Sequence, residues 1–141
     1  MSNITNEKII RDSANRVYDQ LGYGLSENAY QTALANELID LGFNNVQTEY
    51  HVSQYYNTSK NRQVQIADLR IDIIIDNKII LELKTIDGVL NKKDKKSGEL
   101  NMNEISILKE YKQCKRYKEL KNFNEAYLIN FGKKCLEFIV V

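Results

Sequence analysis

Two consecutive segments rich in Ile and Leu, residues 63–75 and 78–86, constrain this chain more than any other part of its sequence. They flank Asp76-Asn77, a pair typical of tight turns, and are therefore predicted to form a β-hairpin. Side chains alternate between the two faces of a strand. One face of the predicted hairpin is entirely aliphatic and carries Ile71, Ile73, Ile75, Ile79, Leu81 and Leu83.

The other face of the hairpin mixes charged and aliphatic side chains, namely Arg70, Asp72, Ile74, Ile80, Glu82 and Lys84. A three-residue turn, Asp76 to Lys78, places Asp72 opposite Glu82 and Arg70 opposite Lys84. Opposed carboxylates repel each other unless a cation lies between them. A divalent metal is the natural candidate, and carboxylate oxygens with retained waters suit Mg²⁺ or Mn²⁺. Lys84 could then orient or deprotonate a water, or hold a phosphate oxygen.

Two other interpretations of this hairpin stay open. Glu-x-Lys by itself is a common pattern on a solvated strand, so Glu82 and Lys84 alone do not define a site. A two-residue turn would shift the pairing by one residue and weaken the opposition of Asp72 and Glu82.

The remaining segments predict three helices and three further strands. Apolar residues recur at helical spacing over residues 6–21, closed by Gly22, and over a second helix that Ser26 can cap and that ends at Gly42. A helix is predicted for residues 104–121, and strands for 46–56, 126–131 and 135–141. The order α α β β β α β β predicts one α/β domain over residues 1–141, with a mixed central sheet flanked by helices.

The composition is that of a globular protein. Hydrophobic residues make up 43% and charged residues 28% of 141 residues, which fits neither a disordered nor a fibrous chain. No apolar stretch is long enough for a membrane span, and the first residues lack the apolar core of a signal peptide. The expected location is intracellular, cytoplasmic by default. Two cysteines and one histidine cannot supply a four-ligand zinc site.

The charge is unevenly distributed, although the net charge is only +1. Residues 92–121 contain ten Lys or Arg against five Asp or Glu, a local charge of +5. This asymmetry is compatible with a polyanionic partner on one face. The alternative is that runs such as residues 92–96 form a solvated loop.

Glu27 is an unusual residue in the first turn of the second helix. It shares a helix face with Tyr30 and Leu34, so its carboxylate is predicted to point toward the packed side. The alternative is a favourable interaction with the partial positive charge of the helix N-terminus.

The segment Leu21-Gly22-Tyr23-Gly24-Leu25-Ser26-Glu27-Asn28-Ala29-Tyr30 resembles the signature of the GxxExxY proteins, a branch of the PD-(D/E)XK nuclease superfamily. The resemblance continues in the same order over most of the chain. It includes Ala33-Leu34, Glu37-Leu38, Arg70-x-Asp72, Glu82-x-Lys84, Gln113-x-x-x-Tyr117 and the run Leu128-Ile129-Asn130-Phe131-Gly132.

The resemblance implies a restriction-endonuclease-like core in which acidic residues gather at one end of the sheet. Asp72 and Glu82 match the family's metal ligands, Glu27 its helix acid, which joins them at the metal, and Lys84 its catalytic lysine. Gln113 and Tyr117 match side chains on the later helix that face the site. The sequence departs from the family at Tyr23 and Ile71, where proline is usual, and in a longer, more basic loop at residues 92–103.

The function expected from these features is a nuclease that uses Mg²⁺ or Mn²⁺ to hydrolyse phosphodiester bonds of nucleic acid, with DNA favoured over RNA. Whether cleavage is endo or exo stays open, and a homodimer is compatible with the size of the chain. The alternative is a non-catalytic module on the same fold that binds nucleic acid or protein. The expected nucleic-acid-binding residues are the cations of the later helix, Lys109, Lys112, Lys115, Arg116 and Lys118.

Overall fold

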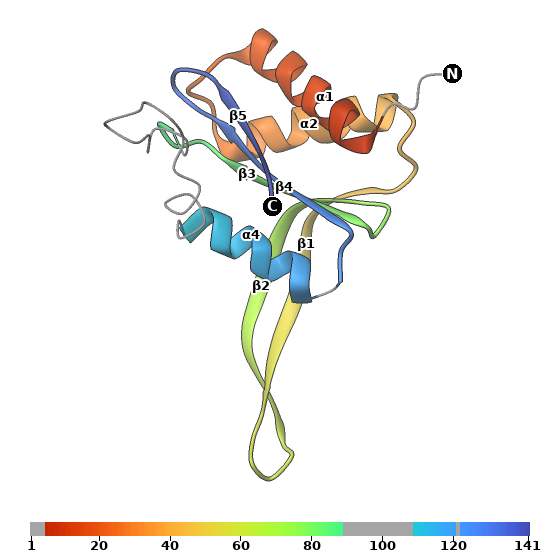
Figure 1. The fold of residues 1–141 in the computed structure, drawn as a ribbon, viewed down its shortest axis with the longest axis vertical. Coiled ribbons are helices and arrows are strands. Elements are labelled where there is room, and N and C mark those ends of the chain that lie inside the picture. Colours follow the sequence, from red (N-terminus) through yellow and green to blue (C-terminus); the bar gives the residue numbers. More distant parts are fainter. Residues whose placement is uncertain (1–4, 89–108, 121) are drawn as a thin grey trace.

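The computed structural model describes residues 5–88, 109–120 and 122–141, which form a five-stranded sheet with helices on both faces (Figure 1). The strands lie in the order β1-β2-β3-β4-β5; β3 and β4 run parallel and all other neighbours are antiparallel. This mixed α/β arrangement confirms the predicted element order and is consistent with a restriction-endonuclease-like fold. The elements are α1 (Asn6–Leu21), α2 (Glu27–Asp40), β1 (Val46–Asn57), β2 (Gln63–Ile75), β3 (Ile79–Lys84), α4 (Lys109–Leu120), β4 (Glu125–Phe131) and β5 (Leu136–Val140).

The first two helices begin at polar N-caps, as expected. The Thr5 hydroxyl accepts a hydrogen bond from the Lys8 backbone N–H, and the Ser26 hydroxyl accepts one from Ala29. Helix α1 ends at Gly22, whose φ of 70° lies in the region that glycine adopts without strain. The short loop that follows places Glu27 in the first turn of α2.

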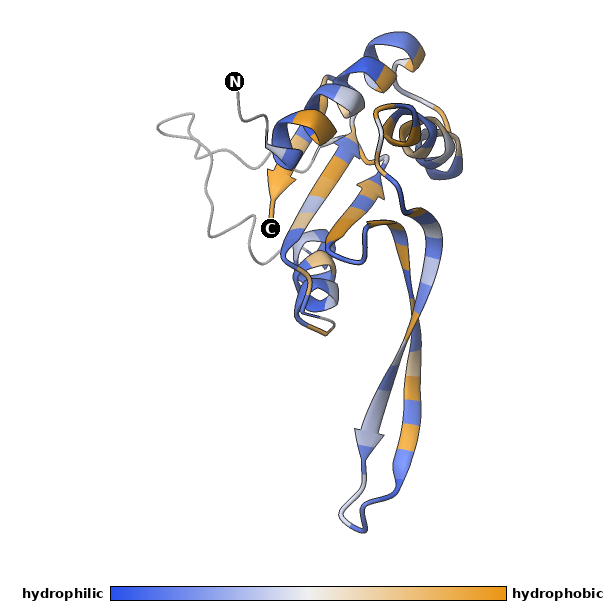
Figure 2. Ribbon diagram, turned by 90° about the vertical axis from the view of Figure 1, so that its right-hand side faces the viewer, coloured by the Kyte–Doolittle hydropathy of each residue, from blue (hydrophilic) through white to orange (hydrophobic). Residues whose placement is uncertain are grey.

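Helices α1 and α2 cover one face of the sheet and α4 lies against the other (Figures 1 and 2). The larger core cluster, between the sheet and α1 and α2, contains five of the six residues of the predicted aliphatic face: Ile73, Ile75, Ile79, Leu81 and Leu83. The smaller cluster under α4 contains Ile71, Ile74, Ile80, Cys114 and Tyr117.

The prediction for the later part of the chain is only partly covered by the described residues. The helix expected at residues 104–121 is described from Lys109 to Leu120, and residues 104–108 and 121 lie outside the described part. The basic loop at residues 92–103 also lies outside it. Strand β3 ends at Lys84 rather than at residue 86. Within the described residues, none of the helices combines the length and the apolar character needed to cross a membrane.

Strands β2 and β3 have the predicted register, but they separate earlier than the sequence suggested. Ile75 pairs with Ile79 across the three-residue turn, and the ladder ends where Ile73 pairs with Leu81. Beyond this point β2 leaves β3 and continues with β1 alone, as a long twisted ribbon that projects from the body of the protein (Figure 1).

This separation corrects two predictions about the hairpin. Arg70 does not lie opposite Lys84; it pairs with His51 of β1. Ile71 does not join the core under α1 and α2, but packs in the cluster on the α4 side with Val52. The reason for both is that β2 twists away with β1 as its partner.

Candidate active site

The two strand carboxylates lie at the fork where β2 and β3 separate. The Asp72 backbone N–H donates to Glu82 Oε1 at 3.2 Å, and the Leu83 N–H donates to Asp72 Oδ2 at 2.8 Å. Carboxylate oxygens therefore accept hydrogen bonds from the backbone N–H groups that no longer pair with the opposite strand, and these hydrogen bonds hold the two carboxyl groups beside each other. Within the described residues, Asp72 Oδ1 and Glu82 Oε2 have no hydrogen-bond partner.

Both carboxyl groups are buried, with residue exposures of 6% for Asp72 and 3% for Glu82. Burial and the neighbouring Asp72 carboxylate raise the pKa of Glu82 to about 8, although the hydrogen bond from the Asp72 N–H and the charge of Lys84 act in the opposite direction. Burial also raises the pKa of Asp72, against the effects of the Leu83 N–H and Lys84. Neither group forms an ion pair with another described residue. The two groups can therefore ionise together only at a considerable electrostatic cost.

The donor set of this pair fits a hard divalent cation. Two oxygens without a protein donor lie on two adjacent buried carboxyl groups, and Mg²⁺ is commonly bound by one or two carboxylates together with waters. The described part of the chain contains no group of three or more His, Cys, Asp or Glu side chains arranged to hold a metal ion. The structure thus brings together Asp72 and Glu82, and Glu27 does not complete a three-acid group with them.

Glu27 nevertheless lies close enough to the pair to interact with it electrostatically. It is solvent-exposed in the first turn of α2, rather than pointing into the packed side as predicted. Partial desolvation raises the pKa of its carboxyl group; Lys84 and Arg70 lower that pKa, and Asp72 raises it. The first turn of α2 therefore lies near the fork of the sheet.

Lys84 is held by side chains of α4. It is half-buried on the strand that carries Glu82, and its ammonium group donates to Gln113 Oε1 at 3.4 Å. Gln113 Nε2 in turn donates to Tyr117 Oη at 2.8 Å. Burial and the nearby Glu82 raise the pKa of Tyr117, so its phenol stays neutral at ordinary pH. The chain Tyr117–Gln113–Lys84 brings together three residues that the sequence placed at the site.

The five cations of α4 fall into two groups. Lys109, Lys112 and Arg116 line a pocket of about 460 Å³ together with Leu69, Gln113 and Tyr117. Since Gln113 also bonds to Lys84, this pocket lies next to the fork. Lys115 is exposed and does not line the pocket, and Lys118 donates to the Val141 backbone carbonyl at 3.0 Å.

Sequence reasoning assigned no role to two residues that support the site. The Tyr30 hydroxyl accepts a hydrogen bond from the Leu25 N–H and donates one to the Gly22 carbonyl. Its ring stacks on that of Phe131, with 4.2 Å between the ring centroids. These contacts fix the loop before Glu27. Buried Asn130 bonds through its amide to both the N–H and the carbonyl of Ile86, just beyond β3. The sequence signal for Asn130 was a polar residue in the apolar strand β4.

Comparison with known proteins gives the class of the chain. Residues 4–98 match the family model described as the PD-(D/E)XK nuclease superfamily. The chain belongs to this superfamily, whose nucleases typically use divalent metals.

Other comparisons are less informative. No curated protein matches the sequence. The solved structure titled "Crystal structure of SSO0001" is similar over 100% of this chain and 79% of that chain, with 16% sequence identity and a TM-score of 0.46.

Proposed function

We propose that this protein is a nuclease of the GxxExxY branch that hydrolyses phosphodiester bonds of DNA with Mg²⁺ or Mn²⁺, and that residues 1–141 form its single nuclease domain. The observation that carries the proposal is the buried pair of Asp72 and Glu82 at the fork of β2 and β3, with Lys84 beside it. A stable fold does not need two buried acids without a cationic partner, since such a pair opposes folding. A divalent cation bound between the two carboxylates would offset their repulsion and so explain why both are buried there.

Asp72 and Glu82 are the residues that would hold the metal, through the oxygens that accept no backbone hydrogen bond. When bound, such a cation polarises the scissile phosphate and lowers the pKa of water. The backbone N–H groups of Asp72 and Leu83 keep both carboxyl groups in place. Glu27 adds a hydrogen-bond acceptor and negative charge at the rim of the site.

Lys84 acts on the phosphate and on the attacking water. Its ammonium group offsets the negative charge on the oxygens around phosphorus in the transition state and orients the water for attack. Gln113 and Tyr117 are positioning residues, because they fix the lysine side chain through the hydrogen bonds described above. The pocket cations of α4 hold the phosphates that flank the scissile bond.

A nuclease assay tests the proposal directly. We expect metal-dependent cleavage of at least one substrate among supercoiled, linear, branched and single-stranded DNA, with RNA tested in parallel, and loss of cleavage in EDTA. Binding of these substrates without any cleavage in saturating Mg²⁺ or Mn²⁺ would instead support the non-catalytic binding module. DNA as the main substrate is contradicted if only RNA is cut.

Glu27→Gln separates a role at the site from ordinary helix stabilisation. We expect turnover to fall about tenfold or more and the activity to need more Mg²⁺, since loss of a residue that supports a metal site costs about 10- to 100-fold. Removing an acid from a helix N-terminus should cost at most about 1 kcal/mol of unfolding free energy.

Glu7→Gln is the matched control, because Glu7 occupies the first turn of α1. Glu7→Gln should lower the free energy of unfolding by a similarly small amount but leave turnover unchanged. If Glu27→Gln, Glu7→Gln and the unaltered protein have equal turnover, Glu27 only stabilises its helix and has no role at the site.

The two groups of α4 cations should behave differently toward DNA. Lys112→Ala and Arg116→Ala should weaken binding across all sequences and flatten the salt dependence of the affinity by roughly 0.9 for each lost duplex phosphate contact. Lys115→Ala should change the slope less, because Lys115 lies outside the pocket. Titrations at four or five salt concentrations measure the slope; an identical slope in all three variants would exclude the pocket as a phosphate site.

A further inference from the structure

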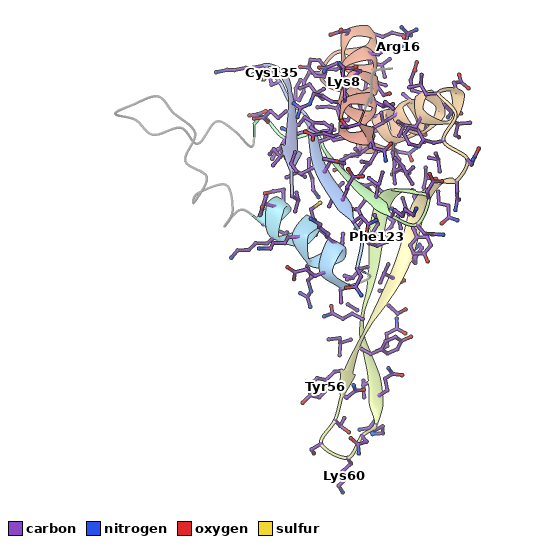
Figure 3. All side chains as sticks on the ribbon, turned by 45° about the vertical axis from the view of Figure 1, so that its right-hand side comes forward. Lys8, Arg16, Tyr56, Lys60, Phe123 and Cys135 are labelled. Atoms are coloured by element: carbon purple, nitrogen blue, oxygen red, sulfur yellow. The ribbon has the colours of Figure 1, made fainter. Side chains whose placement is uncertain are left out.

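The ribbon formed by β1 and β2 is a feature that the catalytic site does not require. It extends the sheet far beyond the body of the protein, and Tyr56 and Lys60 lie near its far end (Figures 1 and 3). None of residues 53–70 is buried. An isolated two-stranded hairpin is marginally stable in water, so a ribbon of this length is poorly explained as a contribution to the core.

One face of the ribbon continues the face of β2 that carries Asp72. Alternate β1 residues share this face, and each pairs with a β2 residue beyond Asp72. The pairs are His51 with Arg70, Ser53 with Asp68, Tyr55 with Gln65, and Asn57 with Gln63. A register shift between Gln54 and Tyr55 lets the face continue through Gln65 and Gln63. A row of polar side chains therefore runs outward from the fork of the sheet.

The far end of the ribbon carries the charge that a polyanion requires, whereas its base is mixed. The carboxylates nearest the site have basic neighbours, since Glu49 lies 3.6 Å from Arg70 and Asp68 lies 3.2 Å from His51 Nδ1. Residues 53–67 contain no Asp or Glu, and Lys60 and Arg62 occupy the far end. The ribbon thus changes from mixed charge near the metal-binding acids to positive charge at the turn between Asn57 and Gln63.

The outer part of the face also offers free hydrogen-bonding groups. The side chains of Tyr55, Asn57, Gln63 and Gln65 are exposed and form no hydrogen bond with any described residue. Amide side chains of Asn and Gln bond bidentately to adenine, and the major groove of B-DNA accommodates a two-stranded β-ribbon. The reverse face differs, because its base, with Val52, Leu69 and Ile71, packs on the α4 side.

We propose that the polar face of this ribbon binds a groove of double-helical DNA on one side of the scissile phosphate. This inference rests on the proposed nuclease function. Gln63 lies nine positions before Asp72 on the extended strand β2, a reach of roughly 30 Å. That distance corresponds to about nine base pairs of B-DNA. The ribbon therefore sets a footprint on the duplex that exceeds what the cleavage site itself covers.

A shortened protein tests the inference with duplexes of two lengths. Residues 54–67 are replaced by a two-residue Asn-Gly turn between Ser53 and Asp68, which pair in the structure. We expect this variant to lose about tenfold or more affinity for a duplex of about 24 base pairs, and to bind and cleave one of about 8 base pairs as the full chain does. Fluorescence anisotropy in Ca²⁺ measures binding, and Mg²⁺ starts cleavage.

Point variants keep the inference testable if the shortened chain folds poorly. The double variant Gln63→Ala/Gln65→Ala should lose affinity for the long duplex only, whereas Gln54→Ala, on the reverse face, should bind both lengths like the unaltered protein. The inference is overturned if the ribbon variants change the affinity for the long and the short duplex equally. It is also overturned if light scattering shows a dimer that depends on the ribbon while DNA binding does not depend on duplex length. If the unaltered protein neither binds nor cleaves any nucleic acid, the proposed function fails as well. Cleavage that is independent of the ribbon at both lengths overturns the ribbon inference alone.

Discussion

Asp72→Asn and Glu82→Gln will each reduce cleavage by more than about a hundredfold, since even the loss of a residue that only orients a metal ligand costs about 10- to 100-fold. Both variants should also weaken Mg²⁺ binding, which calorimetry measures. The fold should survive, because each amide keeps an oxygen that can accept the backbone hydrogen bond made by the natural carboxylate. Removing the repulsion between two buried acids should hold or raise the thermal stability without metal.

Two comparisons make this result specific. Asp76→Asn, in the exposed turn between β2 and β3, removes a carboxylate from the same hairpin and should leave cleavage and Mg²⁺ binding unchanged. Lys84→Ala should retain Mg²⁺ binding but lose turnover, since its proposed contribution is to the transition state. Undiminished Mg²⁺ binding in both acid variants would contradict the assignment of Asp72 and Glu82 as ligands.

Metal-free protein will become less stable as the pH rises from about 5 to about 8. The pKa of Glu82 is about 8 in the folded chain and 4.5 as its ordinary value, so the folded state binds more protons between these limits. The free energy of unfolding therefore falls with rising pH in this window, by an amount on the order of 3 kcal/mol. The raised pKa of Asp72 acts in the same direction. For a chain of this size the loss corresponds to about 10 °C in Tm.

Mg²⁺ should reverse this trend, because a cation that binds the ionised pair competes with protons. The gain in Tm on adding Mg²⁺ should accordingly grow between pH 5 and pH 8. Glu82→Gln provides the control, since it removes the ionising group and should flatten the pH dependence of the metal-free protein. Thermal unfolding in EDTA and in Mg²⁺ over this range measures both effects, and a metal-free stability that rises with pH would contradict the buried-acid interpretation.

The hairpin shows how much of this protein could be predicted from local patterns. The register of β2 and β3 was predictable because Asp76-Asn77 marks a turn and the aliphatic residues alternate, and the structure confirms it from Ile75 and Ile79 to Ile73 and Leu81. Beyond Ile73 the same alternation continues, so no local pattern indicates that β2 loses β3 as a partner there. The ladder ends there because β2 twists away from β3 together with β1, which pairs with the opposite edge of β2 along its whole length.

The supporting hydrogen bonds of the site were also out of reach for sequence reasoning. Gln113 and Tyr117 were known only through resemblance, and their bonding to Lys84 depends on how α4 packs across the sheet. The same packing determines which cations face the pocket: Lys112 and Arg116 do, and Lys115 does not. Helical spacing predicts which residues share a face, but it does not reveal which face meets the sheet.

By itself, the sequence determined where α1 and α2 begin, the order of the strands and the opposition of Asp72 and Glu82, since caps, turns and alternation are properties of neighbouring residues. The tertiary structure decided where β2 and β3 separate, how deeply the two acids are buried and how near Glu27 comes to them. These features depend on segments distant in the chain that pack together, and burial is what raises the pKa of Glu82 and favours a cation at the fork.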